Sequence, residues 1–555
     1  MLLVSFQQNR HLQLTTMTID IREVDAVVVG GGFAGVRLAH LFKNRLRLPN
    51  VVGIDRGSDI GGTWFWNQYP GAQSDSESWV YTFSDNGEPK WTNRYLNAKQ
   101  VQAQIKDTAQ RTGIYDDFIF ENDVVSAHYD AERNRWEIAT DKGLRFSATY
   151  FVGALGILSR PNLPKYAIAD ADADADADTF QGLAFHSSRW PRDLDVTGKR
   201  VAVIGTGPSG SQIAATIHPK VKQLTVFQQR AQYITPVNDR SIPDDEKAKI
   251  QANHRDLWET VFGSLYAMGY AESQKSALEA TPEQRKEVYE YLWNKGGGFS
   301  FFFESFADLG TNFEANETAA AFIRGKIAEI VKDPKTAKLL QPEGAYGGRP
   351  LCAHGYYESF NQPNVALVDI ASNPVAKLTK TGLQLQDGQV LEFDVIVYAT
   401  GYDAVDGAYG TIDITGRNGR KLTEAWKDGP NALYGLSVAD FPNLFTVSGP
   451  GGPFSNIPPA IEVQGDFVAE LVEESVKRGG TVVEAQPKAQ EQWDETVQAV
   501  SKQTVFDSVK SWIQSNNVVG KKKYSAFFLG GLSNYKTKLG EEADAKYPSF
   551  VFGSA

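Results

Sequence analysis

The sequence predicts an α/β protein with two Rossmann-like dinucleotide-binding domains, the second inserted in the first and carrying a helical insertion. Three observations support this fold class. Residues 30–35 read Gly-x-Gly-x-x-Gly after a strand-like run and before a helix-like segment. Residues 205–210 repeat the same pattern in the same context. Strand patterns return after residue 360 and continue beyond residue 380, where the first domain is expected to resume.

Length, charge and cysteine content set the class of protein. A chain of 555 residues is too long for one hydrophobic core, so several domain-sized units are expected. A formal net charge of −11 argues against binding to nucleic acid phosphates. The single cysteine, Cys352, excludes an internal disulfide, a Cys-x-x-Cys redox pair and a cysteine-rich zinc site, and no metal is expected.

No targeting or membrane segment is expected. The apolar N-terminal residues lack a basic lead and a cleavage site, and no apolar run is long enough to span a bilayer. We therefore expect a cytoplasmic protein without a membrane partner. The sequence leaves the oligomeric state open, and a monomer is the favoured expectation.

The expected domains follow from these elements. Residues 1–24 are predicted to be a loose tail, 25–160 and 380–555 the first dinucleotide domain, 161–240 and 341–379 the second domain with its linkers, and 241–340 the helical insertion. The Ala-Asp repeat at 169–178 repels itself and is predicted to be a solvated loop.

The first domain begins with a βαβ unit. A strand at 25–29, a helix at 33–48 and a second strand at 51–54 are predicted. Residues 61–83, rich in Gly, Trp and Tyr, are expected to form a long ordered loop with a functional role. Residues 118–149 alternate apolar and polar residues, which is typical of an antiparallel meander.

The second domain repeats the βαβ unit, and the first domain then resumes. The predicted elements are strands at 200–204, 223–227, 365–369, 394–398 and 444–447, helices at 209–218 and about 461–477, and helical character over 244–340.

The first glycine turn has the features of a phosphate-binding loop. Gly30 permits the tight turn, Gly32 lets the backbone approach a pyrophosphate, and Gly35 permits close helix–strand packing. Asp55 lies at the end of the second strand, where a carboxylate accepts hydrogen bonds from a ribose 2′-OH and repels a 2′-phosphate. The turn therefore indicates FAD or NAD rather than NADP. The alternative is a plain glycine turn.

The second turn differs in the charge at its ribose end. The strand that follows it ends in Gln228-Gln229-Arg230, without a carboxylate. An arginine there can pair with a 2′-phosphate, so NADPH is the better interpretation. The alternative is that Arg230 is an ordinary solvated charge.

A segment between the two turns carries the most specific pattern. Residues Phe180-x-Gly182-x-x-x-His186-x-x-x-Trp190-Pro191 resemble the fingerprint of the flavin-dependent Baeyer–Villiger monooxygenases, and the chain is nearest the cyclohexanone monooxygenase type. Further stretches that resemble the family are Gly61–Gly71, Gly348–Leu351, Ala399–Tyr402, Gly449–Pro459 and Lys510–Trp512, so that the resemblance covers nearly the whole chain.

The resemblance implies an FAD-containing, NADPH-dependent monooxygenase. It would insert one atom of O₂ beside the carbonyl of a hydrophobic ketone, through a C4a-peroxyflavin and a tetrahedral adduct, and give an ester or lactone. Two alternatives stay open: an N- or S-oxygenating flavin monooxygenase of related fold, and a non-enzymatic NADP(H) sensor.

The resemblance also implies the catalytic residues. Arg349 matches the catalytic arginine, and Asp75 matches the carboxylate that orients it. The physical argument agrees, because a peroxide anion in a dry site needs a fixed cation, and a guanidinium is not deprotonated by such a base. The alternatives are a surface ion pair for Arg349 and a turn cap for Asp75.

The implied cofactor and substrate contacts form a larger set. FAD is assigned to Gly30, Gly32, Ala34, Gly35, Asp55, Thr63, Trp64, Tyr81, Val124 and Ile457, and NADP to Gln73, Ser74, Gly205, Thr206, Gly207, Ser209, Gly210, Gln229, Arg230 and Trp512. Phe454 and Pro458 are expected to border an apolar substrate pocket. His186 is interpreted as a hinge residue or a structural histidine, and not as a general base.

Two residues depart from the family pattern. Gln229 stands where relatives have an arginine, and Gly348 stands where relatives often have a lysine. Both positions help bind the 2′-phosphate in relatives, so the strictness of NADPH over NADH is left open.

Overall fold

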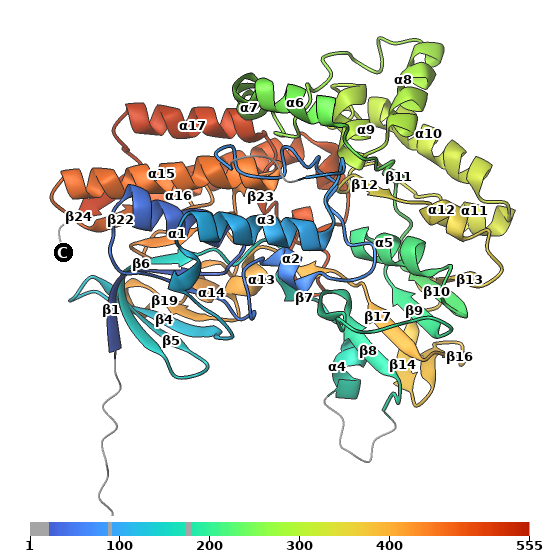
Figure 1. Cartoon of the computed structure of the whole chain (residues 1–555), viewed down its shortest axis with the longest axis horizontal. Helices are drawn as coiled ribbons and strands as arrows, with labels where there is room; N and C mark the ends of the chain where they lie inside the picture. The colour runs from blue at the N-terminus through green and yellow to red at the C-terminus, as the bar shows by residue number, and fades with distance from the viewer. Residues whose placement is uncertain (1–20, 87–90, 172–178, 554–555) are drawn as a thin grey trace, which may run out of the picture.

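Two β-sheets with helices packed on them form the two halves of the protein in the computed structural model (Figure 1). The structure describes residues 21–86, 91–171 and 179–553. The predicted tail up to residue 20 and residues 172–178 of the Ala-Asp repeat lie outside these ranges.

The first sheet has the strand order β19-β4-β5-β6-β1-β2-β3, and β20 also pairs with β6. Its strands are β1 (Ile21–Val29), β2 (Val51–Ile54), β3 (Phe118–Ile119), β4 (Val124–Asp130), β5 (Arg135–Thr140), β6 (Arg145–Gly153), β19 (Asp413–Thr415) and β20 (Leu444–Thr446). β1 runs parallel to β2 and β6, and β4, β5 and β6 form the predicted antiparallel meander. The strand at 413–415, which was not predicted, pairs with β4.

The first βαβ unit is confirmed, with α1 at Phe33–His40 continued by a π-helical turn at Leu41–Arg45. The predicted tail is wrong for residues 21–24. These residues extend β1, because Ile21 to Val24 pair in register with β6 from Arg145 onward. Residues 21–23 are exposed, so no buried apolar pattern marks this end of the strand.

The second sheet is all parallel, with the order β13-β10-β9-β17-β8. Its strands are β8 (Leu183–His186), β9 (Arg200–Ile204), β10 (Gln223–Gln228), β13 (Val365–Asp369) and β17 (Val395–Tyr398). The predicted boundary at residue 380 is therefore wrong for β17, which lies between β9 and β8. An apolar run predicts a buried strand but does not show which sheet the strand joins, because that depends on the strands with which it pairs.

The smaller strands and helices of the second half lie around this sheet. They are β7 (Arg160–Pro161), β11 (Ile234–Pro236), β12 (Leu351–Ala353), β14 (Val375–Thr379), β15 (Gly382–Leu385), β16 (Val390–Glu392), β18 (Tyr402–Asp403), α4 (Lys165–Ala171), α5 (Pro208–Ile217) and α12 (Tyr356–Ser359). Residues 169–171 of the Ala-Asp repeat, predicted to be loop, are the end of α4.

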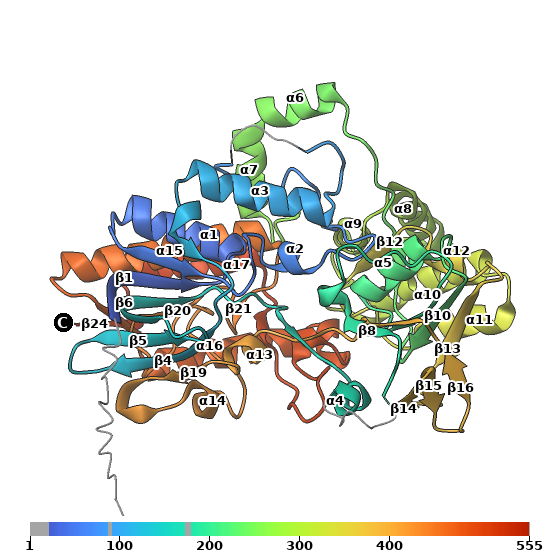
Figure 2. The same ribbon diagram turned by 60° about the horizontal axis from the view of Figure 1, so that its bottom comes forward.

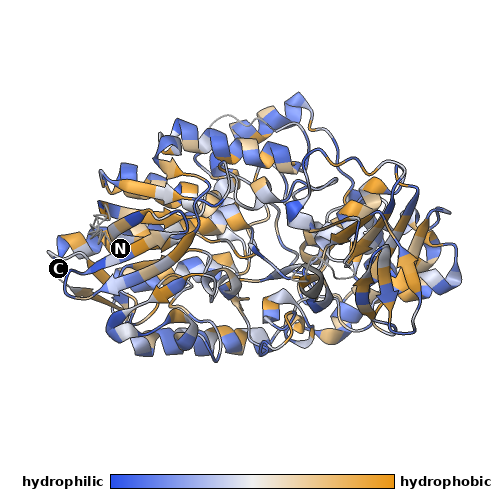
Figure 3. Ribbon diagram, turned by 90° about the horizontal axis from the view of Figure 1, so that it is seen from below, coloured by the Kyte–Doolittle hydropathy of each residue, from blue (hydrophilic) through white to orange (hydrophobic). Residues whose placement is uncertain are grey.

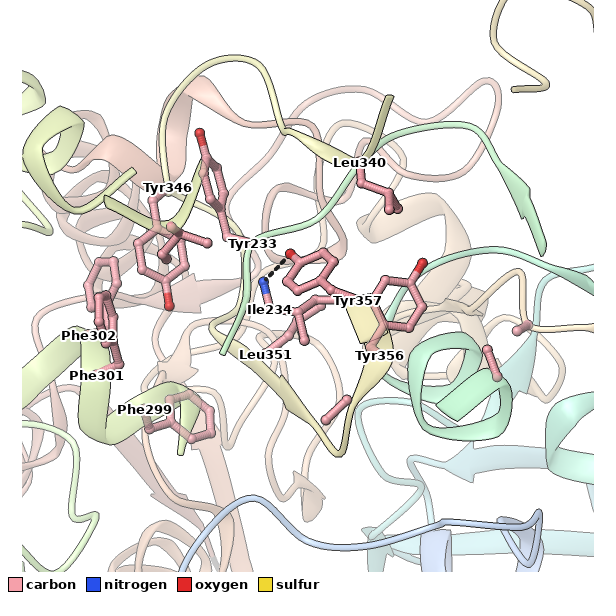
Figure 4. Packing of buried hydrophobic residues seen from close by; sticks show 14 of the residues in the cluster. Tyr233, Ile234, Phe299, Phe301, Phe302, Leu340, Tyr346, Leu351, Tyr356 and Tyr357 are labelled. Carbon is pink, nitrogen blue, oxygen red and sulfur yellow. Dashed lines mark hydrogen bonds between the residues drawn. The ribbon is translucent and has the colours of Figure 1, made fainter. Parts of the chain in front are cut away.

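The predicted helical insertion is present as six helices. They are α6 (Asp244–Ala252), α7 (His254–Gly263), α8 (Pro282–Lys295), α9 (Gly298–Ser305), α10 (Phe313–Ile330) and α11 (Pro334–Leu340). α9 is buried through Phe299, Phe301 and Phe302, and Figure 4 shows these rings in the cluster that includes Tyr346 and Tyr233. This packing fixes α9 against the second half of the protein.

The C-terminal elements return to the first sheet. They are α13 (Asp406–Tyr409), α14 (Leu422–Ala425), β21 (Gly452–Pro453), α15 (Ile457–Lys477), β22 (Val482–Ala485), α16 (Pro487–Lys502), β23 (Phe527–Phe528), α17 (Leu532–Asp544) and β24 (Phe550–Gly553). Helices α1 and α15 lie together on one side of the first sheet (Figure 2), with α2 (Thr63–Trp66) and α3 (Ala98–Arg111) near them.

Apolar residues concentrate on the strands of both sheets, and the outer helices turn polar residues outward (Figure 3). No helix in the described ranges combines the length and apolar character that crossing a bilayer requires.

The close packing of the first glycine turn predicts that Gly35→Ala destabilises the protein. A Cβ at Gly35 would lie 1.6 Å from the carbonyl oxygen of Gly30, so the backbone must move. We expect a loss of about 1–3 kcal/mol in the free energy of unfolding, measured by chemical denaturation.

The matched control is Gly325→Ala in α10, where a Cβ would meet no atom within 4 Å. This change should stabilise the protein by about 0.5–1 kcal/mol, because alanine favours a helix over glycine. Equal effects of the two substitutions would contradict the packing argument.

Candidate functional site

One cavity lies between the two sheets and is lined by both glycine turns. Residues of the first turn, Gly30–Ala34, face residues 207–209 of the second turn across it. The loop at 61–76, Arg349 and the C-terminal segment around Phe454 and Trp512 complete the lining. The two glycine turns, each of the kind that binds a dinucleotide, therefore line the same cavity.

The first turn has the geometry of an anion-binding loop. Gly32 is the N-cap of α1 and makes no side-chain cap, so the first N–H groups of the helix are left for a ligand. Gly30 has φ +112°, and a Cβ there would lie 2.3 Å from the carbonyl oxygen of Ala154. The turn therefore fits a pyrophosphate, as the sequence predicts.

Asp55 is held at the end of β2, beside this turn. Its carboxylate accepts hydrogen bonds from the backbone N–H groups of Gly31 and Gly57. Burial raises the pKa of Asp55, and these hydrogen bonds oppose that rise. Asp55 lines the cavity, and a carboxylate oxygen that accepts one hydrogen bond can accept another, which fits a ribose hydroxyl.

Aromatic side chains from the loop and its surroundings close the first half of the site. The indole N–H of Trp64 donates to the hydroxyl of Tyr81 at 3.2 Å, and both residues line the cavity, as Thr63 does. Val124 was predicted to contact FAD, but its side chain is buried in the core beneath the sheet. Its neighbours Asn122 and Asp123 line the cavity instead.

The second turn repeats this geometry around α5. Gly207 is an N-cap without a side-chain partner, and Gly205 has φ +114°. The hydroxyl of Thr206 donates to the carbonyl of Arg230 at 2.7 Å, which ties the turn to the end of β10. The guanidinium of Arg230 donates to the carbonyl of Lys510 at 2.6 Å and is otherwise exposed. Arg230 is thus placed at the ribose end of this turn.

Asp75 and Arg349 form a bidentate ion pair in the lining of the cavity. Nη1 and Nη2 of Arg349 donate to the two carboxylate oxygens of Asp75 at 2.5 and 2.7 Å. Burial alone would lower the pKa of Arg349, but the carboxylate of Asp75 outweighs it and keeps that pKa above its ordinary value. Arg349 is therefore a permanent cation in a partly buried position.

Phe299 is a functional candidate that the sequence analysis missed. The guanidinium carbon of Arg349 lies 4.8 Å from the centre of the Phe299 ring, and both residues line the cavity. The ring face attracts the cation. A run of phenylalanines in a helix gives no signal for this role, because most of them are core residues.

A hydrogen-bond chain links the Asp75 loop to the second half. The hydroxyl of Tyr69 donates to Gln212 Oε1 at 2.9 Å, and Gln212 Nε2 donates to the carbonyl of Gln73 at 3.2 Å. Gln73 Nε2 in turn donates to Asp239 at 2.9 Å. Gln73 and Ser74 both line the cavity, so the predicted loop faces the α5 side.

His186 is a buried, neutral histidine at the end of β8. Its Nε2–H donates to the carbonyl of Gly401 at 3.0 Å, and its Nδ1 accepts from the backbone N–H of Ser188 at 3.2 Å. Burial lowers the pKa of His186 to about 4. His186 does not line the cavity.

The other fingerprint residues shape the linker rather than the cavity. A Cβ at Gly182 would lie 2.6 Å from the carbonyl oxygen of Asp394, so only glycine fits there. Trp190 is buried and packs edge-to-face on Phe185 at 5.3 Å.

The structure separates the predicted site residues into two groups. Those that line the cavity are Gly30, Gly32, Ala34, Asp55, Thr63, Trp64, Gln73, Ser74, Asp75, Tyr81, Gly207, Ser209, Arg349, Phe454, Ile457 and Trp512. Those outside its lining are Gly35, Val124, Phe180, Gly182, His186, Trp190, Pro191, Gly205, Thr206, Gly210, Gln229, Arg230 and Pro458. Several of the second group hold the turns in shape, and Pro458 is buried in the first turn of α15.

Comparison with known proteins gives close relatives over the whole chain. A family model described as flavin-binding monooxygenase-like matches residues 25–249. A Baeyer–Villiger monooxygenase from Pseudooceanicola batsensis is 39% identical over 95% of this chain and 96% of its own length. A cyclohexanone 1,2-monooxygenase from Acinetobacter is 39% identical over 95% and 96%. A phenazine N-monooxygenase from Lysobacter antibioticus is also 39% identical, over 96% and 98%.

Solved structures agree with these matches. A closed crystal structure of cyclohexanone monooxygenase superposes with a TM-score of 0.93 at 40% identity, covering 97% of this chain and all of the other. The cyclohexanone monooxygenase from Rhodococcus sp. Phi1 bound to NADP⁺ gives the same values.

The buried histidine predicts a pH-dependent stability. His186 stays neutral in the folded protein down to about pH 4, whereas an unfolded histidine takes up a proton near pH 6.5. The unfolded state therefore binds more protons between these values, and stability falls as pH drops from 6.5 to 4. We expect His186→Gln, which keeps a donor for Gly401, to reduce this slope by at most about 1.4 kcal/mol per pH unit.

The measurement is chemical denaturation at several pH values between 4 and 6.5. The exposed His254, replaced by Gln, serves as the control and should leave the slope as in the unaltered protein. An unchanged slope in His186→Gln would contradict the neutral, buried state of His186.

Proposed function

The chain belongs to the Baeyer–Villiger monooxygenases, and on this premise we propose that it oxygenates a hydrophobic ketone with O₂, using Arg349 as the catalytic cation. The protein is an FAD- and NADPH-dependent monooxygenase of this type. The observation that supports the proposed role of Arg349 is its two-pronged pair with Asp75 in the cavity between two uncapped helix N-termini.

The residues present fit both cofactors. The backbone of Gly30–Ala34 and the carboxylate of Asp55 would hold FAD, and the backbone of residues 205–210 with Arg230 would hold NADPH. FAD bound here and reduced by NADPH would supply the chemistry that activates O₂, one oxygen atom of which is inserted beside the carbonyl while the other leaves as water. The uncharged Gln229 and Gly348 leave Arg230 to bind the 2′-phosphate, which we propose weakens the preference for NADPH over NADH.

Arg349 stabilises negative charge in this proposal. When the carbonyl of a ketone is attacked, charge develops on oxygen atoms, and a fixed cation in a dry site lowers the energy of that state. The carboxylate of Asp75 keeps the guanidinium in one orientation, because two parallel hydrogen bonds allow little rotation. Asp75 is thus a positioning residue for Arg349.

Phe299 holds the other side of the guanidinium. Its ring lies against Arg349, while α9 is itself fixed by the aromatic cluster of Figure 4. Phe299 is packed at 6.1 Å and nearly parallel to Phe303, which leaves its ring little freedom. We assign Phe299 as a second positioning residue.

The apolar lining favours a hydrophobic ketone. Phe299, Phe454, Ile457 and Phe527 lie along the cavity on the side of Arg349 and the C-terminal segment. Relatives are named for cyclohexanone, cyclopentanone and acetone, which are all small ketones without charge. An uncharged ketone of this class suits such walls.

N-oxygenation is a second candidate, since one relative of equal identity is named as a phenazine N-monooxygenase. The discriminating experiment gives the purified holoenzyme NADPH and O₂ with a panel of cyclic ketones and a panel of aromatic N-heterocycles. Mass spectrometry should find esters or lactones from the ketones. N-oxides alone would contradict the proposal and favour the second candidate.

Loss of the cation predicts uncoupled turnover. In Arg349→Ala, FAD binding and NADPH oxidation should persist, because the glycine turns are untouched. Ester or lactone formation should fall by about 100-fold or more, since a removed oxyanion-stabilising group typically has that effect. Product analysis and NADPH absorbance are measured together, with Arg255→Ala on exposed α7 as the control. Normal ester yield from Arg349→Ala would refute the role.

Removal of the Phe299 ring is predicted to lower ester formation per NADPH, by less than removal of Arg349 does. Phe299→Leu removes an attraction of about 0.5–2 kcal/mol, so ester formed per NADPH should fall roughly 2- to 30-fold with little change in ketone KM. The matched control is Phe301→Leu, another buried phenylalanine of α9, whose ring packs against Tyr289 and Phe322. If both variants lose ester yield equally, Phe299 acts only through packing.

A further inference from the structure

A second cavity of about 490 Å³ lies behind the loop that carries Asp75. Its walls are residues 68–74, the first turn of α3, the segment after Trp190, the α5 face around Ala215, and the end of β12. In Figure 1, α5 lies beside the end of α2, where this loop begins. Its volume falls in the range of small-molecule sites.

The charges around this second cavity come from Lys99 and Arg192. The chain has 67 acidic and 56 basic residues, yet no Asp or Glu lines the cavity, whereas Lys99, Arg192 and His354 do. Within the described residues, neither Lys99 nor Arg192 is paired with a carboxylate. Arg192 lies over the Phe65 ring at 5.0 Å, which leaves its N–H groups for another partner. The cavity therefore favours an anion.

The remaining walls are mixed, with apolar side chains beside the polar groups of residues such as Gln68, Asn97 and Thr216. Pro70, Trp190, Leu194 and Ala215 face the same space as the cations. A small inorganic anion would leave these surfaces in water, whereas an anion with an apolar chain covers them. We propose that this second cavity is a binding site for a small carboxylate with an apolar chain.

The second cavity shares a wall with the main cavity. Tyr69, Gln73, Ser74 and Gln212 line both. The hydrogen bonds from Tyr69 to Gln212 and from Gln212 to Gln73 run within this wall. The loop packs closely on α5 here, because a Cβ at Gly71 would lie 2.1 Å from the Thr216 hydroxyl. A carboxylate in the second cavity therefore acts on both the Asp75 loop and α5.

This shared wall couples the two sites. α5 carries the second glycine turn, so a carboxylate that fixes the wall changes the affinity for NADP⁺, and NADP⁺ changes the affinity for the carboxylate by the same factor. Hydrolysis of an ester or lactone gives a carboxylate of this class. Binding at this site would therefore respond to the concentration of a product formed downstream of the oxygenation. Only this statement about the product rests on the proposed function.

The test is calorimetric binding of hexanoate to the full-length holoenzyme, without NADPH or ketone. We expect one site, and an affinity at least 10-fold weaker in the variant Lys99→Gln/Arg192→Gln. The control Arg145→Gln/Lys222→Gln removes two exposed cations elsewhere and should bind hexanoate as the unaltered protein does. The single variant Lys99→Gln, expected to weaken binding at least 3-fold, serves if the double variant does not fold.

The second arm measures NADP⁺ affinity with and without hexanoate. The unaltered protein should show a shift of at least 3-fold, and Lys99→Gln/Arg192→Gln should show none. Absence of hexanoate binding, equal weakening in the control variant, or inorganic phosphate binding as tightly as hexanoate would overturn the proposal. None of these outcomes depends on oxygenation, so the proposed function is judged separately.

Discussion

The ion pair between Asp75 and Arg349 is the constraint on which the site depends. Asp75 comes from the long loop of the first half, and Arg349 comes from the segment before β12 in the second half. A largely buried ion pair gains little stability over apolar packing, because both charges lose their hydration. Its value is positional: two parallel hydrogen bonds and the ring of Phe299 leave the guanidinium one orientation. The aromatic cluster around α9 supplies the rigidity that this orientation requires.

The two dinucleotide turns explain why the protein has two similar halves. Each turn ends a parallel strand and begins a helix whose N–H groups have no side-chain cap, so each offers a place for phosphates. They differ at the end of the next strand, where Asp55 is buried and Arg230 is exposed. The sign of charge therefore separates the two cofactors, and the cavity between the sheets brings both toward Arg349. The wall between the two cavities contains the hydrogen bonds from Tyr69 to Gln212 and from Gln212 to Gln73, which connect the two halves of the protein.

Much of the fold and several residues of the candidate site could be predicted from the sequence, because they depend on local patterns. Glycine turns, buried strands and amphipathic helices are local patterns, and they gave the βαβ units, the meander and the helical insertion. Predictions that depend on long-range strand pairing were wrong. β17 belongs to the second sheet and not the first, and β1 begins at Ile21, before its apolar residues. The side chain of Val124 lies in the core, and alternation along β4 does not predict which face of the strand lies toward the cavity. Phe299 and the cations around the second cavity were invisible, since their roles arise only when distant segments meet.

The account rests on Asp75 acting through Arg349 and not independently, and a double-mutant cycle tests this most directly. Ester yield per NADPH is measured for the unaltered holoenzyme, Asp75→Asn, Arg349→Ala and the double variant. The account predicts that Asp75→Asn lowers the yield when Arg349 is present and has no further effect once Arg349 is absent. Independent, additive losses in the double variant would contradict it.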